Sequence, residues 1–269
     1  MEATRAGTMS GIRAYYRTRA LEYDRVYAKP EWQDELREME RWLPAQLRGR
    51  RVPEVACAAG GWTQFVAAVA RGVVATDAVP APLEIAQRRI YRRDVAFLLG
   101  DAYHLPSDIG VFDATFAGFW LSPVPRSRQR EFLLQLGERV QPGSPVILFD
   151  NLYVEGSSTA IAESDAEGNT YQLRAPGNGA VHRVLRNFPT DLELLTLAGS
   201  IREDAQFTRW RHYWGLAYVT PIGRRRGELV NDRLRLGLLA GAAVESGSRV
   251  GMAAGALISF GYVRGWRRF

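Results

Sequence analysis

The chain has 269 residues, of which 46% are hydrophobic and 24% charged, as in a soluble globular protein with one large domain or a domain and an appendage. Cys57 is its only cysteine, so an intramolecular disulfide is excluded and a reducing, cytoplasmic setting is expected. No uncharged apolar run reaches the roughly 20 residues that cross a bilayer, and the N-terminus lacks the apolar core of a signal peptide.

The net charge of +6 is carried by the C-terminal segment. Nine of the 35 basic residues but only three of the 29 acidic ones lie in residues 224–269, so residues 1–223 are balanced. A body without a basic surplus argues against binding to nucleic acid phosphates. We expect residues 224–269 to form a poorly ordered tail, with packing against the domain or a second copy, or contact with a membrane, as alternatives.

The first half of the chain alternates helices and strands. Ser10 can cap an amphipathic helix over residues 10–27, and Pro30 begins a second helix that runs to residue 47. From there, strands are expected at 51–57, 72–77, 95–102, 112–120 and 145–151, and helices at 63–70, 81–90 and 127–140. This order predicts an α/β fold with a parallel sheet and helices on both faces.

The pattern changes after residue 151. Residues 152–187 are rich in turn-forming residues and predict an insertion, with a hairpin near 171–185. A helix is expected at 190–199, followed by two closing antiparallel strands at 205–210 and 211–221.

The stretch PEVACAAGGWT (residues 53–63) predicts a buried strand, a tight turn and the start of a helix, where α/β enzymes hold a nucleotide. S-adenosylmethionine, which has no phosphates, would need an acid after the second strand for its ribose and one after the third for its adenine. Asp77 ends the second strand, 17 residues after Gly60, and Asp101 ends the third. Phe119 and Trp120 end the fourth strand and can supply an apolar wall.

In this order, the motifs resemble those of class I S-adenosylmethionine-dependent methyltransferases of the small-molecule type, over about residues 12–220. PEVACAAGGWT stands where that family has its glycine loop; VVATDAVPAPLEIA, GDAYHLP, FDATFAGFWLS and LGERVQPGSPVILFDN are similar to its later motifs. The resemblance implies a Rossmann-like, seven-stranded, mostly parallel sheet with helices on both faces and a reversed last strand. It also implies methyl transfer to a small-molecule acceptor by in-line displacement.

The resemblance also suggests a division of the chain. Residues 1–48 would be an N-terminal helical lid, residues 49–223 the domain that binds S-adenosylmethionine, and residues 224–269 the tail. The insertion at 152–190 would lie on the substrate side. A monomer or a homodimer is expected.

The resemblance assigns five positions to the methionine and ribose portions of the cofactor. Glu54 would hold the loop or reach the methionine amino group, Ala56 would lie in the loop, and Gly60 would allow close backbone approach. Asp77 would accept the ribose hydroxyls, with Ala78 beside the adenine.

Five further positions complete this implied site. Asp101 would bind the adenine amine and Ala102 would give a backbone contact, while Phe119 would lie near the reacting methyl group. Tyr16 and Tyr23 are the candidates to close the lid.

The loop departs from the family pattern at Ala56 and Ala58, which replace its first two glycines. Alanine disfavours positive φ by roughly 1 kcal/mol and adds a methyl group where the cofactor approaches. Weakened binding is expected rather than none. The alternative is a non-catalytic or weakened cofactor-binding protein.

Two other classes of enzyme remain as alternatives. AAGGWTQ is similar to the loop of ribosomal RNA ribose 2′-O-methyltransferases, but those enzymes need two lysines in their active site, and Lys29 is the only lysine here. A dehydrogenase would need a full Gly-x-Gly-x-x-Gly loop, which is missing.

The acceptor and the atom that is methylated cannot be read from the sequence, and no metal is expected. Candidate acceptor-side residues are Asp150 and Asn151, at the end of the fifth strand, and Tyr171 and His182, which could face each other across the hairpin. A base is needed only if the acceptor still holds a proton at the moment of attack.

Overall fold

A computed structural model describes residues 15–17, 19–20, 27–103, 105, 109–175, 179, 181–199, 201 and 205–221. Tyr23 and the tail at 224–269 lie outside these residues. The strands are β1 (Arg51–Val55), β2 (Gly72–Asp77), β3 (Val95–Leu99), β4 (Thr115–Gly118), β5 (Pro145–Asn151), β6 (Glu163–Ser164), β7 (Thr170–Arg174), β8 (His182–Leu185), β9 (Gln206–Arg209) and β10 (Tyr213–Val219). The helices are the 3-10 helix η2 (Pro30–Trp32), α2 (Gln33–Leu47), α3 (Thr63–Val69), α4 (Pro80–Gln87), α5 (Arg126–Glu138) and α6 (Asp191–Gly199).

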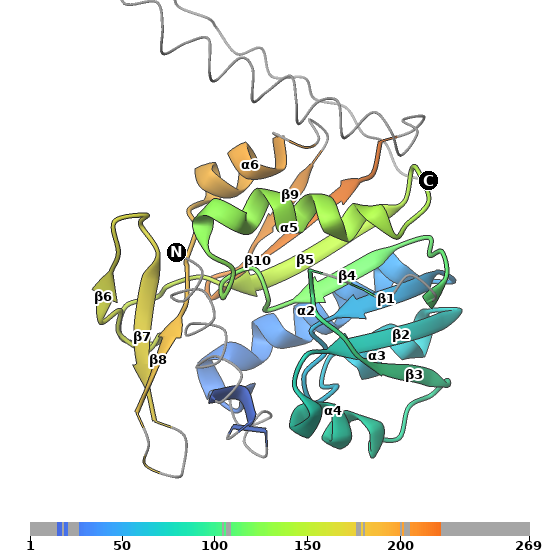
Figure 1. Ribbon diagram of the computed structural model, residues 1–269, viewed down its shortest axis with the longest axis horizontal. Helices are drawn as coiled ribbons and strands as arrows, with labels where there is room; N and C mark the ends of the chain where they lie inside the picture. The colour runs from blue at the N-terminus through green and yellow to red at the C-terminus, as the bar shows by residue number, and fades with distance from the viewer. Residues whose placement is uncertain are drawn as a thin grey trace, which may run out of the picture. The chain divides into compact units, whose positions relative to one another are not determined.

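Seven strands form one sheet in the order β3-β2-β1-β4-β5-β10-β9 (Figure 1). The first five are parallel, whereas β10 pairs antiparallel with β5 and with β9. The predicted fold, with its reversed strand near the end of the sheet, is therefore confirmed. Because β1 to β5 are parallel, their carboxyl ends meet at one edge, where open α/β sheets bind ligands.

Both faces of the sheet are covered, as the alternation of side chains along β5 illustrates. Ile147 and Phe149 pack with α2 and α3 in one core, whereas Val146 and Leu148 pack with α5 and α6 in another. Figure 1 shows these two pairs of helices on opposite sides of the sheet. A strand that is apolar at consecutive positions must be buried on both faces, and this is the pattern that predicted the parallel sheet.

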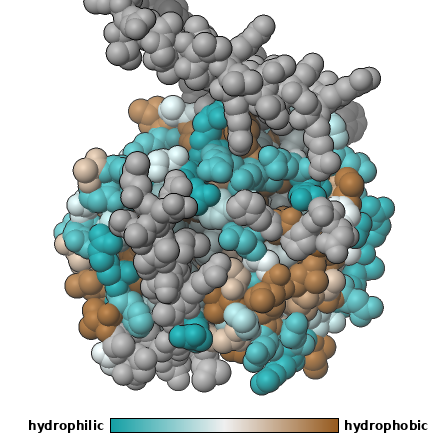
Figure 2. Space-filling model, viewed as in Figure 1, coloured by the Kyte–Doolittle hydropathy of each residue, from teal (hydrophilic) through white to brown (hydrophobic). Residues whose placement is uncertain are grey.

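The insertion forms a second, three-stranded antiparallel sheet in the order β6-β7-β8. The predicted hairpin is confirmed, but its register is not the one that would place Tyr171 opposite His182. Tyr171 pairs with Leu185, at the two ends of the predicted hairpin, and His182 pairs with Arg174. Leu173 is 54% exposed on this sheet, and Figure 2 shows hydrophobic residues at the left edge of the view, where Figure 1 places β6 and β7.

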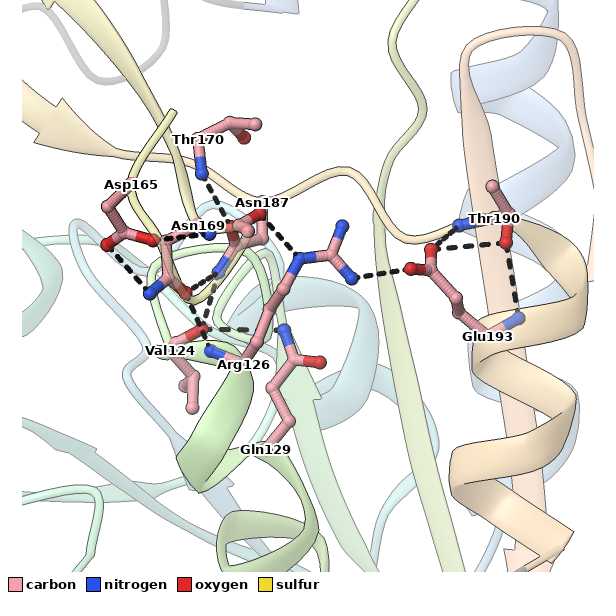
Figure 3. Close-up of polar contacts among 10 residues, drawn as sticks. Val124, Arg126, Gln129, Asp165, Asn169, Thr170, Asn187, Thr190 and Glu193 are labelled. Atoms are coloured by element: carbon pink, nitrogen blue, oxygen red, sulfur yellow. Dashed lines mark hydrogen bonds and ion pairs between the residues drawn. The ribbon is translucent and has the colours of Figure 1, made fainter. Parts of the chain in front are cut away.

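Buried polar contacts fix the insertion to the main domain (Figure 3). The Arg126 backbone N–H, at the start of α5, donates to Asn169 Oδ1 at 2.8 Å, and its guanidinium pairs with Glu193 of α6 at 2.6 Å. The fully buried Asn187 amide donates to the carbonyl of Val124 at 2.9 Å. The insertion is thus tied to the start of α5, which is in turn paired with α6.

Within the part of the chain that the structure describes, no helix is long and apolar enough to cross a membrane.

Candidate functional site

A cavity lies at the carboxyl edge of β1 to β4. Eight of the ten positions expected to bind the cofactor line it: Tyr16, Glu54, Ala56, Asp77, Ala78, Asp101, Ala102 and Phe119. Residues far apart in the sequence are brought together here by four successive strand ends. Of the other two positions, Tyr23 is outside the described residues and Gly60 does not line the cavity.

The loop after β1 closes one side of this cavity in a strained conformation. Ala56 has φ of 58° and Ala58 has φ of 51°, so both alanines adopt the left-handed conformation that glycine would adopt freely. Each costs about 1–2 kcal/mol relative to glycine. The loop is held by backbone hydrogen bonds of 2.9 Å from Cys57 N–H to the Thr76 carbonyl and 3.0 Å from Gly60 N–H to the Cys57 carbonyl.

Gly60 has a packing role that the sequence did not indicate. Its φ is +75°, and a Cβ there would lie 2.2 Å from the hydroxyl oxygen of Tyr91 and 3.0 Å from the Cβ of Ala86. The glycine lets α4 and Tyr91 approach the loop from outside the cavity. Tyr91 is itself held by a 2.9 Å hydrogen bond to the Ala86 carbonyl.

Asp77 fastens the loop to the end of β2. Its Oδ2 accepts a hydrogen bond from Ala58 N–H at 2.9 Å, and its Oδ1 accepts one from Val79 N–H at 2.8 Å. Burial raises the pKa of the carboxyl, while these backbone hydrogen bonds lower it. The carboxylate keeps lone pairs for further donors on its cavity side.

Glu54 is a buried acid of the cavity with a raised pKa. It lies in β1, between Ala75 of β2 and Phe116 of β4, and is only 2% exposed. Burial raises its pKa to about 8, and the nearby charge of Asp77 adds to the shift. Its Oε2 makes no hydrogen bond with the described residues, so a buried carboxyl oxygen is left for a ligand to satisfy.

The opposite side of the cavity is aromatic. Phe119 follows β4 with φ of 57°, which is an uncommon value for a bulky residue. Its N–H donates to the Phe149 carbonyl at 2.8 Å, and its ring lies 4.9 Å from that of Phe149 and 5.7 Å from that of Tyr27. Strained backbone of this kind persists where packing holds it, commonly at functional sites.

A third acid stands at the end of β3. Asp101 lines the cavity, and its Oδ1 accepts a hydrogen bond from Tyr103 N–H at 2.9 Å. The buried Ala102 follows it on the cavity wall.

A second cavity, of about 430 Å³, adjoins the first. Tyr16, Tyr27 and Phe119 line both. The remaining walls come from the N-terminal segment, the end of β5, residues 157–159, β7, residues 186–188 and the start of β10. This volume is in the usual range for small-molecule sites, about 300–1,000 Å³.

The four acceptor-side candidates lie in different places. Asn151 lines the second cavity, while Asp150 is fully buried behind it and accepts hydrogen bonds from the backbone and hydroxyl of Ser122 at 2.8–2.9 Å. Tyr171 does not line either cavity; its hydroxyl donates to Asp165 at 2.9 Å. The ring of His182 packs edge-on against Tyr15, 5.7 Å away.

Several residues of the second cavity were missed by the sequence analysis: Tyr15, Arg19, Arg174 and Arg186. The only available signal was the alternation of the predicted hairpin, which puts residues 172 and 174 on one face. Which face covers the domain depends on tertiary packing. Within the described residues, no group of three or more His, Cys, Asp or Glu side chains is arranged to hold a metal ion.

Comparison with known proteins shows a domain match over part of the chain and a shared fold. Residues 52–143 match the family model described as a methyltransferase domain, and no curated protein was found to match the sequence. Among solved structures, DhpI in complex with SAH is 24% identical with a TM-score of 0.67, over 81% of this chain and 99% of that one. The PH0226 protein from Pyrococcus horikoshii OT3 is 16% identical with a TM-score of 0.57, over 75% and 99%.

A third solved structure is the magnesium protoporphyrin IX methyltransferase of Synechocystis PCC 6803 with bound SAH. It is 15% identical with a TM-score of 0.54, over 78% of this chain and 98% of that one. These likenesses show the fold, and the family model covers the strands and loops that form the first cavity. Residues 52–143 therefore match a methyltransferase domain, and the chain shares its fold with proteins solved in complex with SAH.

Proposed function

We propose that the chain transfers the methyl group of S-adenosylmethionine, bound in the first cavity, to a small molecule bound in the second. The observation that carries this proposal is the junction of the two cavities at Tyr16, Tyr27 and Phe119. A donor and an acceptor held on either side of that junction would meet there. The second cavity has the volume of a small-molecule site and not the extended surface that a nucleic acid requires.

The first cavity offers groups that suit the cofactor. The unsatisfied Glu54 carboxyl would accept the methionine ammonium group, and Asp77 would accept the ribose hydroxyls while holding the loop. Asp101 would lie at the adenine end, with Ala78 and Ala102 as its walls. The cofactor supplies an electrophilic methyl group, and the protein supplies proximity and orientation.

On the acceptor side, Asn151 is the candidate that reaches the second cavity. Its Nδ2 donates to Asp150 Oδ1 at 3.0 Å, so its orientation is fixed and its amide oxygen can accept a hydrogen bond from an acceptor molecule. Asp150 would act through Asn151 and Ser122 as a positioning residue.

The alternative is a protein that no longer binds the cofactor tightly, which the strain at Ala56 and Ala58 favours. Isothermal titration of S-adenosylmethionine and S-adenosylhomocysteine into the purified protein separates the two. We expect micromolar binding that Asp77→Ala abolishes, because the variant loses both the ribose acceptor and the hydrogen bond to Ala58. Absence of binding up to millimolar concentrations would reject the proposal in favour of the alternative.

A further inference from the structure

The second cavity has a strongly one-sided charge. Four cationic side chains line it, Arg19, Lys29, Arg174 and Arg186, and none of the lining residues that the structure describes is Asp or Glu. This contrasts with residues 1–223 as a whole, where basic and acidic residues balance. The described charges that line this cavity are therefore all positive.

The hairpin places two of these arginines together. Arg174 pairs with His182 across β7 and β8, and the Arg186 N–H donates to the carbonyl of Thr170 at 2.8 Å. Alternation along the strands then puts Arg174, His182 and Arg186 on the same face. The Arg186 side chain is only 11% exposed, so it is largely withdrawn from water.

The contacts of Arg174 leave its charge without a described acidic partner. The Arg174 guanidinium donates to Gln172 Oε1 at 2.6 and 3.0 Å and lies 3.5 Å from the Tyr15 hydroxyl, and both of these partners are neutral. Burial and the charge of Arg186 lower the pKa of Arg174. Arg186 approaches Asp150 at 4.0 Å, but that carboxylate already accepts hydrogen bonds from Ser122 and Asn151.

Arg174 and Arg186 line the same partly buried cavity, so an anion bound between them would offset the repulsion between their charges. Guanidinium groups match the oxygens of carboxylates and phosphates in geometry as well as in charge. The cavity has the volume for a small molecule but not for a polymer.

We propose that the acceptor is a small oxyanion, a carboxylate or a phosphate-type acid, whose charged group is bound by Arg174 and Arg186. This inference rests on the proposed function, because it names the substrate class of the same site. The methylated atom lies at the other end of such a molecule or on the acid itself, toward Phe119.

The test is isothermal titration of inorganic phosphate, propionate and the neutral propionamide, with and without S-adenosylhomocysteine. We expect saturable binding of phosphate or propionate, and whichever binds identifies the acid. Propionamide should bind at least about tenfold more weakly than propionate, because it lacks the charge. Equal binding of propionate and propionamide, or no binding of either anion, would overturn the inference.

Variants assign the effect to the arginines. Arg174→Gln should weaken anion binding by about tenfold or more, whereas Arg174→Lys should keep part of it. Arg37→Gln, which removes an exposed arginine on α2, is the matched control and should bind as the wild type does. Unchanged anion affinity in Arg174→Gln would also overturn the inference.

The same titrations separate this inference from the proposed function. Affinity for S-adenosylhomocysteine is measured in every variant and should change less than about twofold, since neither Arg174 nor Arg186 lines the first cavity. Wild-type protein that binds anions but not S-adenosylhomocysteine would reject the methyltransferase proposal alone. Arg186→Gln removes the ion pair with buried Asp150, which can prevent folding. If Arg186→Gln does not fold, the test is decided by Arg174→Gln, because the described partners of Arg174 are neutral.

Discussion

Replacement of Ala58 by glycine tests how much strain the cofactor loop carries. Ala58 has φ of 51°, and relieving that conformation should recover about 1–2 kcal/mol. Glycine gives back about 0.5–1 kcal/mol through the greater freedom of the unfolded chain. We therefore expect Ala58→Gly to stabilise the folded protein by about 0.5–1 kcal/mol, a rise in Tm of roughly 1–4 °C for a chain of this size.

The matched control lies at the next residue. Ala59 is 2% exposed and is not among the described residues with positive φ, so Ala59→Gly should destabilise by about 0.5–1 kcal/mol or more. Urea denaturation of both variants measures the difference. If Ala58→Gly loses stability as Ala59→Gly does, the assignment of strain to Ala58 is refuted.

Two further changes give distinct readouts. Burial raises the pKa of Glu54 to about 8, well above its unfolded value near 4.3, so the folded state holds more protons between these pH values and its stability falls as pH rises through them. Glu54→Gln should remove part of that decline in urea denaturation from pH 5 to 9; parallel curves for the two proteins would contradict the buried carboxyl. Asn187→Ala should cost about 1–3 kcal/mol, because it strands buried partners at Val124, Asn169 and Thr170. Limited proteolysis should then cut residues 155–185 faster while S-adenosylhomocysteine affinity stays unchanged; a general loss of protease resistance would speak against a local anchor.

The cofactor side of the site was largely predictable from the sequence. Each acid follows a short apolar strand, and parallel strands bring their carboxyl ends to one edge whatever the details of packing. The positions of Asp77 and Asp101 therefore followed from order alone. The conformation of Ala56 and Ala58 was also foreseeable, since they occupy positions where the chain must turn sharply between β1 and α3.

The acceptor side was not predictable in the same way. Asp150 and Asn151 are neighbours in β5, so their side chains point to opposite faces of the strand. Asp150 is buried and Asn151 lines the cavity, and the sequence pattern does not show which of the two faces the cavity. The register that joins Arg174 to His182 depends on where the hairpin turns. Gly60 shows a related limit, because its φ could be anticipated but its contact with Tyr91, 31 residues later, could not.

The anchoring of the insertion has a consequence for how molecules enter and leave. Asn169 and Asn187 attach β7 and β8 to the start of α5, and α5 follows the same loop that carries Phe119 (Figures 1 and 3). Lifting the hairpin as a flap would break several buried hydrogen bonds at once, each worth about 0.5–1.5 kcal/mol. The hairpin therefore acts as a fixed roof. Exchange of molecules with the second cavity should therefore proceed without lifting of the hairpin, and its rate should not depend on hairpin opening.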